Sequence, residues 1–255
     1  MKSAADSSVQ PAIEPATCPV FEPYPLTSRD LDTLRPPGPG ELLLWRFRSE
    51  WQLISRDAGH QRLSQAELKR MRTHPHAAFG KRFAVGRAVL RSLLAPMTGE
   101  APERIALIDD AGGRVRCAGN PQARALDIAV DYAGIWILIG IASCPLGIGT
   151  EAPRSIDRAI AATRAAARRA ALAMAAGEPP PVDAARLEQE GPALWVDLPP
   201  TGSWHLLDIP MAGELCATVA AAARVTRITA FGWRHTHALA PTSAAPFRQA
   251  SGRGF

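Results

Sequence analysis

Residues 125–151, ALDIAVDYAGIWILIGIASCPLGIGTE, decide the fold class. Two apolar runs of strand length, Ala125–Val130 and Ile135–Ala142, flank a short turn that contains glycine. The second run is almost wholly apolar, which predicts a buried strand. The segment Gly147–Glu151 then closes this half of the chain.

Helices and a strand precede this stretch. Glu41–Phe47 has the composition of a strand, and Ile105–Ile108 that of another. Ser64 and Glu67 form a capping-box pattern, which predicts that Leu63–Arg72 begins a helix. Phe79–Leu94 has apolar residues at helical spacing, with arginines on its other faces.

The second half repeats the order of a helix followed by strands. An alanine-dominated helix is predicted over Ser155–Ala176, ended by Gly177 and prolines. Strands are predicted at Leu194–Leu198, Trp204–Ile209 and Val225–Phe231, whereas Glu214–Ala222 is compatible with a strand or a helix. We therefore expect an α+β fold of two related subdomains, residues 41–150 and 151–240. An irregular leader (1–40) and a disordered tail (241–255) complete the expected organisation.

The positive charge of the chain is concentrated in its first half. The net charge is +5, and lysine occurs only at positions 2, 69 and 81, so 26 of the 29 basic residues are arginine. Between Arg46 and Arg91 there are 11 basic and 3 acidic residues, a local charge of +8. This distribution predicts an anionic partner, and the planar fork of arginine suits phosphate.

Several classes of protein are not indicated. The four cysteines form no CxxC pair, which disfavours a zinc site or a dithiol centre and favours free thiols. There is no secretory h-region and no apolar run long enough to cross a bilayer, so we expect a cytoplasmic protein without a membrane partner. The arginines of AAARRAALAMAA lack interleaved aromatic residues, so no nucleic-acid partner is expected.

Six segments follow one another in a specific order: LSQAELKRMR, FAVGRAVLRSLLA, GEAPERI, AGGRV, ALDIAVDYAG and ILIGIASCPLGIGTE. Over about Leu63–Glu151 this succession resembles the larger, surfactin-type 4′-phosphopantetheinyl transferases. The corresponding family motifs are LSxxERxR, RxxLRxLL, GxxPxxI, GKP, SHS and GIDIE. Weaker likenesses extend to ELLLWRF and to AGELCATVAAA.

The resemblance implies a fold, a reaction and its partners. Family members transfer the phosphopantetheine arm of coenzyme A to a serine of an acyl or peptidyl carrier protein. Their fold is a pseudo-twofold pair of α+β subdomains, with coenzyme A and magnesium in the cleft between them. The Asp and Glu of GIDIE hold the metal, and a later WxxKEA motif supplies a Lys and a Glu.

This sequence departs from the family at the metal and catalytic positions. GIDIE is matched by residues 147–151, so Gly149 replaces the Asp while Glu151 remains. Loss of a carboxylate predicts that Mg²⁺ binds weakly or not at all, unless Asp131 or Asp157 contributes. The best match to WxxKEA places Ala165 and Ala166 at the Lys and Glu positions. Arg164, Arg168 or Arg169 would supply charge there but not proton transfer.

The phosphate-facing positions are better preserved. Arg87 and Arg91 match the helix arginines, Arg114 matches the basic residue of GKP, and Tyr132 stands where SHS has its histidine. By the resemblance these four residues bind coenzyme A, although Asp131 beside Tyr132 would repel a phosphate. The alternative is that the arginines are solvated residues of an amphipathic helix and a turn.

Other candidate residues have simpler explanations. His74 and His76 lie in a proline-bearing segment between helices, and His235 and His237 have no acidic residue close in sequence. Asp109 and Asp110 lead into a glycine turn and are predicted to be turn residues.

Two functions remain open at this point. The first is a phosphopantetheinyl transferase whose activity is weak or lost. The second is a non-catalytic descendant that binds a carrier protein or coenzyme A as a partner or regulator.

Overall fold

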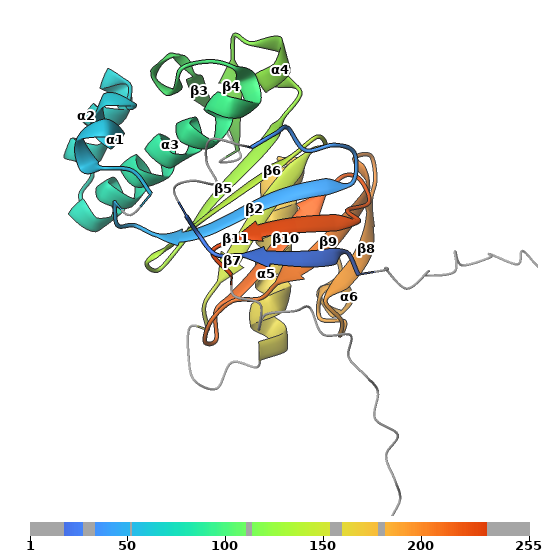
Figure 1. Cartoon of the computed structure of the whole chain (residues 1–255). Helices are drawn as coiled ribbons and strands as arrows, with labels where there is room; N and C mark the ends of the chain where they lie inside the picture. The colour runs from blue at the N-terminus through green and yellow to red at the C-terminus, as the bar shows by residue number, and fades with distance from the viewer. Residues whose placement is uncertain are drawn as a thin grey trace, which may run out of the picture.

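A computed structural model describes residues 18–27, 34–51, 53–110, 114–153, 160–177 and 182–233. Within these ranges the chain has a mixed α+β fold with two β-sheets (Figure 1). The larger sheet has the strand order β1-β11-β2-β6-β5-β4-β3, and the smaller one the order β7-β10-β9-β8. No helix among the described residues is long and apolar enough to span a membrane.

The elements of the first half confirm the predicted strands and helices. They are β2 (Glu41–Arg48), α1 (Arg56–Gln61), α2 (Gln65–Thr73), α3 (Ala77–Thr98), the 3-10 turn η2 (Pro102–Arg104), β3 (Ala106–Asp109), β4 (Val115–Ala118), α4 (Pro121–Arg124), β5 (Asp127–Ala133) and β6 (Trp136–Ala142). Helix α2 begins with the predicted capping box: Glu67 N–H donates to Ser64 Oγ, and Ser64 N–H donates to the Glu67 carboxylate.

The second half contains β7 (Leu146–Glu151), α5 (Ile160–Ala176), α6 (Ala184–Leu187), β8 (Ala193–Leu198), β9 (Gly202–Ile209) and β10 (Cys216–Ala221). The ambiguous segment Glu214–Ala222 is therefore a strand, since β10 pairs antiparallel with both β7 and β9. The sheet overrides the helix preference of its alanines.

The same connectivity occurs twice along the chain. A strand (β2 or β7) leads to a long helix (α3 or α5) and then to further strands, four in the first half (β3 to β6) and three in the second (β8 to β10). In each half the last of these strands returns to pair with the first strand. The resulting antiparallel orders are β2-β6-β5-β4-β3 and β7-β10-β9-β8, so the first half has one more strand at its edge. This is the connectivity expected of two related subdomains, and a twofold axis between them stays a prediction.

The predicted boundaries need three corrections. Val20–Tyr24, expected within an irregular leader, forms β1 and pairs parallel with β11 (Arg227–Phe231). Strand β11 itself joins the first sheet rather than the second subdomain. The change from one sheet to the other falls between β6 and β7, before the expected boundary at residue 150. The expected tail, 241–255, lies outside the described residues.

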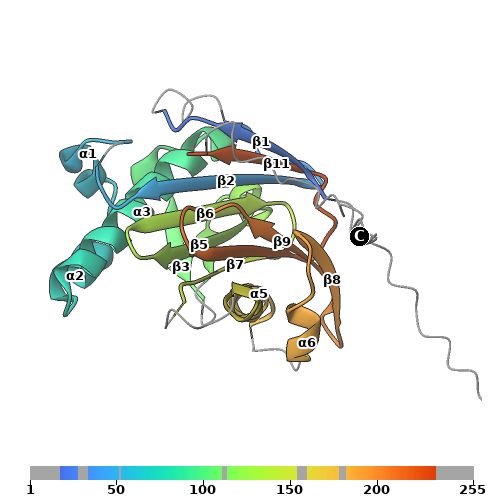
Figure 2. The same cartoon turned by 90° about the horizontal axis from the view of Figure 1, so that it is seen from below.

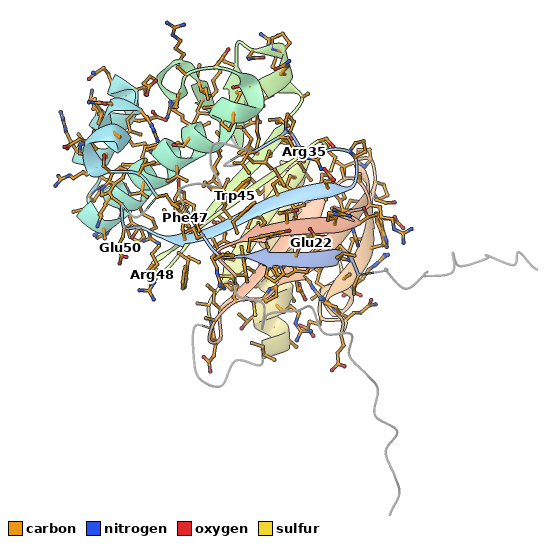
Figure 3. The ribbon with its side chains drawn as sticks, viewed as in Figure 1. Glu22, Arg35, Trp45, Phe47, Arg48 and Glu50 are labelled. Carbon is orange, nitrogen blue, oxygen red and sulfur yellow. The ribbon has the colours of Figure 1, made fainter. Side chains whose placement is uncertain are left out.

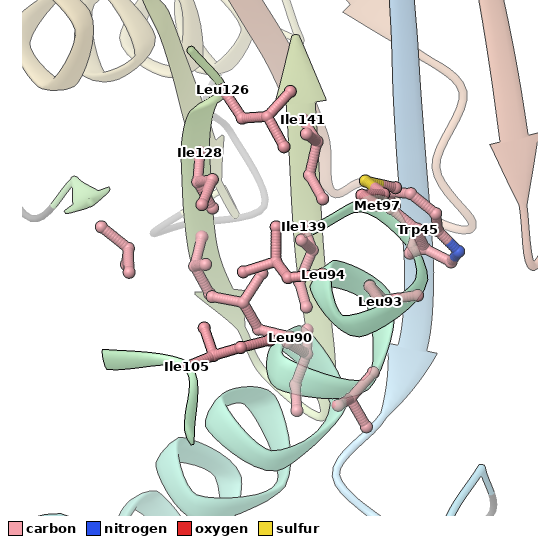
Figure 4. Packing of buried hydrophobic residues seen from close by; sticks show 14 of the residues in the cluster. Trp45, Leu90, Leu93, Leu94, Met97, Ile105, Leu126, Ile128, Ile139 and Ile141 are labelled. Atoms are coloured by element: carbon pink, nitrogen blue, oxygen red, sulfur yellow. The ribbon is translucent and has the colours of Figure 1, made fainter. Parts of the chain in front are cut away.

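The elements stack in four layers, with α3 on one outer face and α5 on the other (Figures 1 and 2). Alternate residues of the central strands face opposite layers. Ile137, Ile139 and Ile141 of β6 pack with α3, as do Trp45 and Phe47 of β2 (Figures 3 and 4). The intervening positions of β6 and β2 pack against the smaller sheet. The position of a residue in a strand thus decides which layer it faces.

His205 of β9 is fully buried, and its ring stacks on Trp195 of β8 with the centroids 4.6 Å apart. Its Nδ1 accepts a hydrogen bond from the amide of Val225, while Nε2 has no partner. Burial lowers the pKa of His205 to about 4. The ring is therefore neutral in the folded protein at pH 7.

We expect this histidine to make folding stability depend on pH. Its pKa is lower in the folded state than in the unfolded chain, so its stabilising contribution is complete above pH 6.5 and is lost as the pH falls towards 4. Over that window the loss is about 3 kcal/mol. Urea unfolding at several pH values measures it.

The control for this prediction is His205→Gln, which should remove most of the pH dependence. Burial raises the pKa of Asp127 and of Asp131, and these two groups act in the opposite direction as the pH falls. They are common to both proteins, so the difference between wild type and variant isolates the histidine. Parallel pH profiles for the two proteins would contradict the prediction.

Candidate functional site

Gly149 stands at the position where the resemblance implies a metal-binding aspartate, and α5 fills the space beside it. Gly149 faces α5 from β7, and a Cβ built on it would lie 2.8 Å from the Cβ of Ala170. It would lie closer still to the carbonyl oxygen of Ala167 and to the amide nitrogen of Ala171. Because these are backbone atoms in the middle of a helix, no side chain fits at this position.

The alanines of α5 explain this close approach. Ala167, Ala171 and Ala175 recur every four residues on one face of the helix and are buried against β7 and its neighbours. Gly147 is packed in the same way, with a Cβ that would meet the backbone of α5. Small residues on both elements bring helix and strand together and leave no room for carboxylates between them.

The other described candidates for a magnesium site do not form a cluster of ligands. Ala165 is buried and Ala166 is partly exposed, and neither carries a ligand atom in its side chain. Asp131 faces β7, where its carboxylate accepts a 2.6 Å hydrogen bond from Thr150 Oγ1 and a second from the amide of Tyr132. No group of three or more His, Cys, Asp or Glu side chains in the described part of the chain could hold a metal ion. Asp157 lies outside the described residues.

The arginines of α5 do not replace the missing lysine. Arg168 is buried, and all five of its N–H donors are used: two by the Asp208 carboxylate and three by the carbonyls of Leu187, Gln189 and Gly191. Arg164 lies 3.8 Å from the same carboxylate. Arg169 is exposed on the outer face of the helix. Arg168 therefore holds the segment after α6 to the smaller sheet.

Arg91 and Arg114, both predicted to bind coenzyme A, are engaged in separate structural contacts. Arg91 is 3% exposed, pairs with Glu67 at 2.9 Å and donates to the carbonyl of Ile105. Arg114 donates to the carbonyl of Ala175, at the C-terminal end of α5. The side chain of Arg91 joins α3 to α2 and to the segment before β3, on the other side of the larger sheet.

Glu151, the one family metal ligand that the sequence retains, is also distant from Arg114. Asp127, which pairs with Arg114 at 4.0 Å, accepts a hydrogen bond from the amide of Leu146 at the start of β7. Glu151 ends the same strand. Five residue steps separate the two ends, which is about 16 Å. Arg87, Arg91, Arg114 and Glu151 therefore do not converge on one cleft.

Arg87 and Tyr132 do lie together, at a site that we call the arginine corner and define by Arg70, Arg82, Arg87 and Tyr132. Asp109 bridges two of the arginines, with one carboxylate oxygen on Arg87 and the other 2.8 Å from Arg70. The guanidinium groups of Arg70 and Arg87 also lie over the ring of Phe83, at 4.3 and 5.2 Å from its centroid.

The packing of α3 places Tyr132 at the arginine corner. Position 132 of β5 faces α3, where a Cβ on Gly86 would lie 2.9 Å from the phenol oxygen. The absence of a side chain at Gly86 therefore makes room for the tyrosine. Asp131 faces the opposite side of the sheet and bonds to Thr150. The repulsion of a phosphate that we expected from Asp131 is reduced, because the sheet lies between the two side chains.

The arginine corner has hydrogen-bond donors without partners. Burial raises the pKa of Tyr132 to about 12, against the opposing effect of Arg87, so its hydroxyl keeps its proton. Among the described residues nothing accepts a hydrogen bond from that hydroxyl. Arg82 makes no ion pair with a described carboxylate and lies over Phe79 at 4.5 Å from the ring centroid. The Nε of Arg87 is buried without a partner, and burial lowers the pKa of this residue.

Three arginines against one carboxylate leave the arginine corner positively charged, which suits an anionic ligand. Within the described ranges of the chain, no carboxylate, thiol or imidazole at the arginine corner is placed as a base or nucleophile. The helix arginines Arg87 and Arg91 are 6% and 3% exposed, so the alternative that they are solvated is wrong.

Sequence reasoning missed Arg70, Arg82 and the bridging role of Asp109. Asp109 is the last residue of β3 rather than part of a turn, and it comes close to Arg70 and Arg87 only through the fold. The positive local charge between Arg46 and Arg91 was the available signal. His74 and His76 flank the segment between α2 and α3, while His235 and His237 lie outside the described residues.

Neither the protein-family models nor the curated proteins give a match to this chain. The resemblance to the 4′-phosphopantetheinyl transferases therefore stays an expectation that rests on the order of the sequence motifs.

Proposed function

We propose that the chain is a non-catalytic relative of the 4′-phosphopantetheinyl transferases that binds coenzyme A through its phosphates at the arginine corner. The observation that carries the loss of transfer is the packing at Gly149. In the resembling family a carboxylate at this position holds magnesium, and here the backbone of α5 occupies the space that the carboxylate would need.

Three further features support the proposal. Each half of the chain contributes a strand, a long helix and then an antiparallel set of four (β3 to β6) or three (β8 to β10) strands, as expected for a pair of related subdomains. The acid–base positions of the later motif are Ala165 and Ala166, and Arg168 is fixed by Asp208. The phosphate-facing position keeps a donor, since the protonated Tyr132 hydroxyl stands in place of the family histidine.

Coenzyme A suits this site because its phosphates are negatively charged and accept hydrogen bonds. Phosphate oxygens accept hydrogen bonds from phenol and guanidinium groups, and the guanidinium of Arg82 has no carboxylate partner among the described residues. Coenzyme A carries several phosphate oxygens on a flexible chain, so it can reach more than one donor of this site. An acyl or peptidyl carrier protein remains the second proposed partner, by resemblance alone.

Calorimetric titration with coenzyme A tests the proposal. We expect binding that is unchanged by EDTA, because the proposed site uses no metal. Tyr132→Phe removes only the hydroxyl, and Arg82→Gln removes the unpaired charge; each should weaken binding about tenfold, or about 1.4 kcal/mol. The matched control is Arg124→Gln, which changes an exposed arginine at the end of α4.

Two results would contradict this function. One is the absence of measurable heat with both coenzyme A and a panel of apo carrier proteins. The other is coenzyme A binding that is equally tight in wild type, Tyr132→Phe and Arg82→Gln, which would place the ligand elsewhere. Binding that appears only with added magnesium would favour the alternative of a weak enzyme.

A further inference from the structure

A second positively charged site lies on the outer side of the helices that cover the larger sheet. A pocket of about 490 Å³ is lined by residues of α1, α2 and the start of α3. These three helices lie side by side in Figure 1. We call this pocket the cationic pocket and define it by six of its lining residues, which are Trp51, Arg56, His60, Arg72, His74 and Lys81. Its volume lies in the range of sites for small molecules.

The lining of this pocket contains three permanent positive charges and no carboxylate. Arg56, Arg72 and Lys81 make no ion pair with any carboxylate in the described part of the chain, and all three are exposed. Arg87 and Arg91 on the same helix α3 are each paired with an acid. Three uncompensated cations around one hollow repel one another and attract an anion.

The local helix electrostatics do not account for two of these cations. Arg56 is the first residue of α1, and Lys81 lies in the second turn of α3, whose first turn contains no acidic residue. Arg56 lies at the positive end of α1, with Asp57 in the same first turn, whereas Lys81 lies beyond the first turn of α3, where the helix dipole has little effect. Arg72 differs, because it lies in the last turn of α2 and is favoured there.

The aromatic lining residues are held in place by packing. Gly59 lies directly against the ring of Trp51, since a Cβ there would overlap the indole. His60 meets the same ring edge-on, with the centroids 5.6 Å apart. Arg56 and His60 are four residues apart on α1 and so share the face that borders the pocket. His74 is fixed by hydrogen bonding between its Nδ1 and the backbone of His76.

We infer that the cationic pocket binds a small ligand that carries two or more phosphate groups. A ligand with several anionic oxygens matches three cations from three different helices better than a ligand with a single carboxylate does. The Trp51 ring adds a flat apolar surface beside them, so a nucleoside polyphosphate and an inorganic polyphosphate are two sources of the same chemistry. This site is separate from the arginine corner, because it shares none of the residues that define the latter.

The test uses inorganic pyrophosphate, ADP and adenosine as calorimetric probes. We expect pyrophosphate and ADP to bind and adenosine not to bind. Arg56→Gln, Arg72→Gln and Lys81→Gln should each weaken the binding of both anions by about two- to fivefold, since each removes one charge from an exposed position. If ADP binds more tightly than pyrophosphate and Trp51→Phe removes this difference in affinity, the pocket recognises a ligand with an aromatic ring. If the two probes bind with equal affinity, the pocket recognises the phosphates alone.

Arg124→Gln is the matched control and should leave pyrophosphate binding unchanged. The inference is separated from the proposed function by measuring each site in the variant that disables the other. Pyrophosphate should still bind to the cationic pocket of Tyr132→Phe, and coenzyme A should still bind to the arginine corner of Arg72→Gln. The inference is overturned if neither anion binds, or if Tyr132→Phe weakens them and the pocket variants do not. It is also overturned if only an oligonucleotide binds, which would indicate a nucleic-acid surface.

Discussion

Gly149→Asp should unfold the protein instead of restoring a metal site. The new side chain would have to enter the backbone of α5 at Ala167 and Ala171, and it would bury a carboxylate between a strand and a helix. Overpacking and an unpaired buried charge act together here, so we expect a loss of at least about 4 kcal/mol of unfolding free energy. Gly149→Ala should cost about 1–3 kcal/mol through overpacking alone.

Urea unfolding followed by far-UV circular dichroism measures both variants of Gly149. The matched control is Gly38→Ala, where an added Cβ meets only Glu41 at an ordinary distance of 3.5 Å and the stability should hardly change. A folded Gly149→Asp protein that binds Mg²⁺ would show that α5 can withdraw from β7, and it would refute the proposed reason for the lost activity.

Arg168→Met should give the second largest effect. The guanidinium is 1% exposed and satisfies the Asp208 carboxylate and three carbonyl oxygens. Removing it leaves a carboxylate and three acceptors without their donor, for which we expect a loss of about 3–5 kcal/mol. Asp208 keeps only the hydroxyl of Thr218 and the distant Arg164 as partners.

The neighbouring Arg169→Met serves as the control for this variant, because Arg169 is exposed on the same helix. Its unfolding midpoint in urea should stay close to that of the wild type. If the two methionine variants unfold at the same urea concentration, the buried network around Arg168 contributes nothing measurable and the prediction fails.

Local patterns in the sequence were sufficient for most of the elements. The capping box at Ser64 and Glu67 depends on residues three apart, and such a signal survives in any fold. The burial of β2 and β6 on both faces likewise follows from the sequence, because their residues are largely apolar. One layer packs on each face of these strands. The segment β10 could not be settled in this way, since its two partner strands decide its state.

The failures of prediction have one common physical origin, which is tertiary contact. The helical spacing of the α3 arginines is compatible with solvent-exposed side chains. In the structure Arg91 forms an ion pair with Glu67 of α2, and Arg87 forms one with Asp109 of β3. Strand β4 and helix α4 lie in a segment whose glycine, asparagine and proline residues are typical of turns. Val20–Tyr24 becomes a strand only because β11 returns to the edge of the first sheet.

For the candidate site, too, the sequence showed which residues are substituted, and the structure was needed to show which residues lie together. Gly149, Ala165 and Ala166 were visible as substitutions in the motifs, and they were enough to predict weak or absent magnesium binding. That a helix lies in direct contact with the strand at Gly149, with no room for a side chain, required the structure. The sequence favoured four phosphate-binding positions, and the structure brings only Arg87 and Tyr132 together.

The proposed loss of transfer is tested most directly by mass spectrometry of carrier proteins. The protein is mixed with coenzyme A, Mg²⁺ and several apo acyl and peptidyl carrier proteins, and an active phosphopantetheinyl transferase converts the same carriers in parallel. We predict that the carrier masses stay unchanged in the presence of this protein while the active enzyme adds the phosphopantetheine arm. A mass gain of that arm on any carrier, absent when this protein is omitted, would contradict the account.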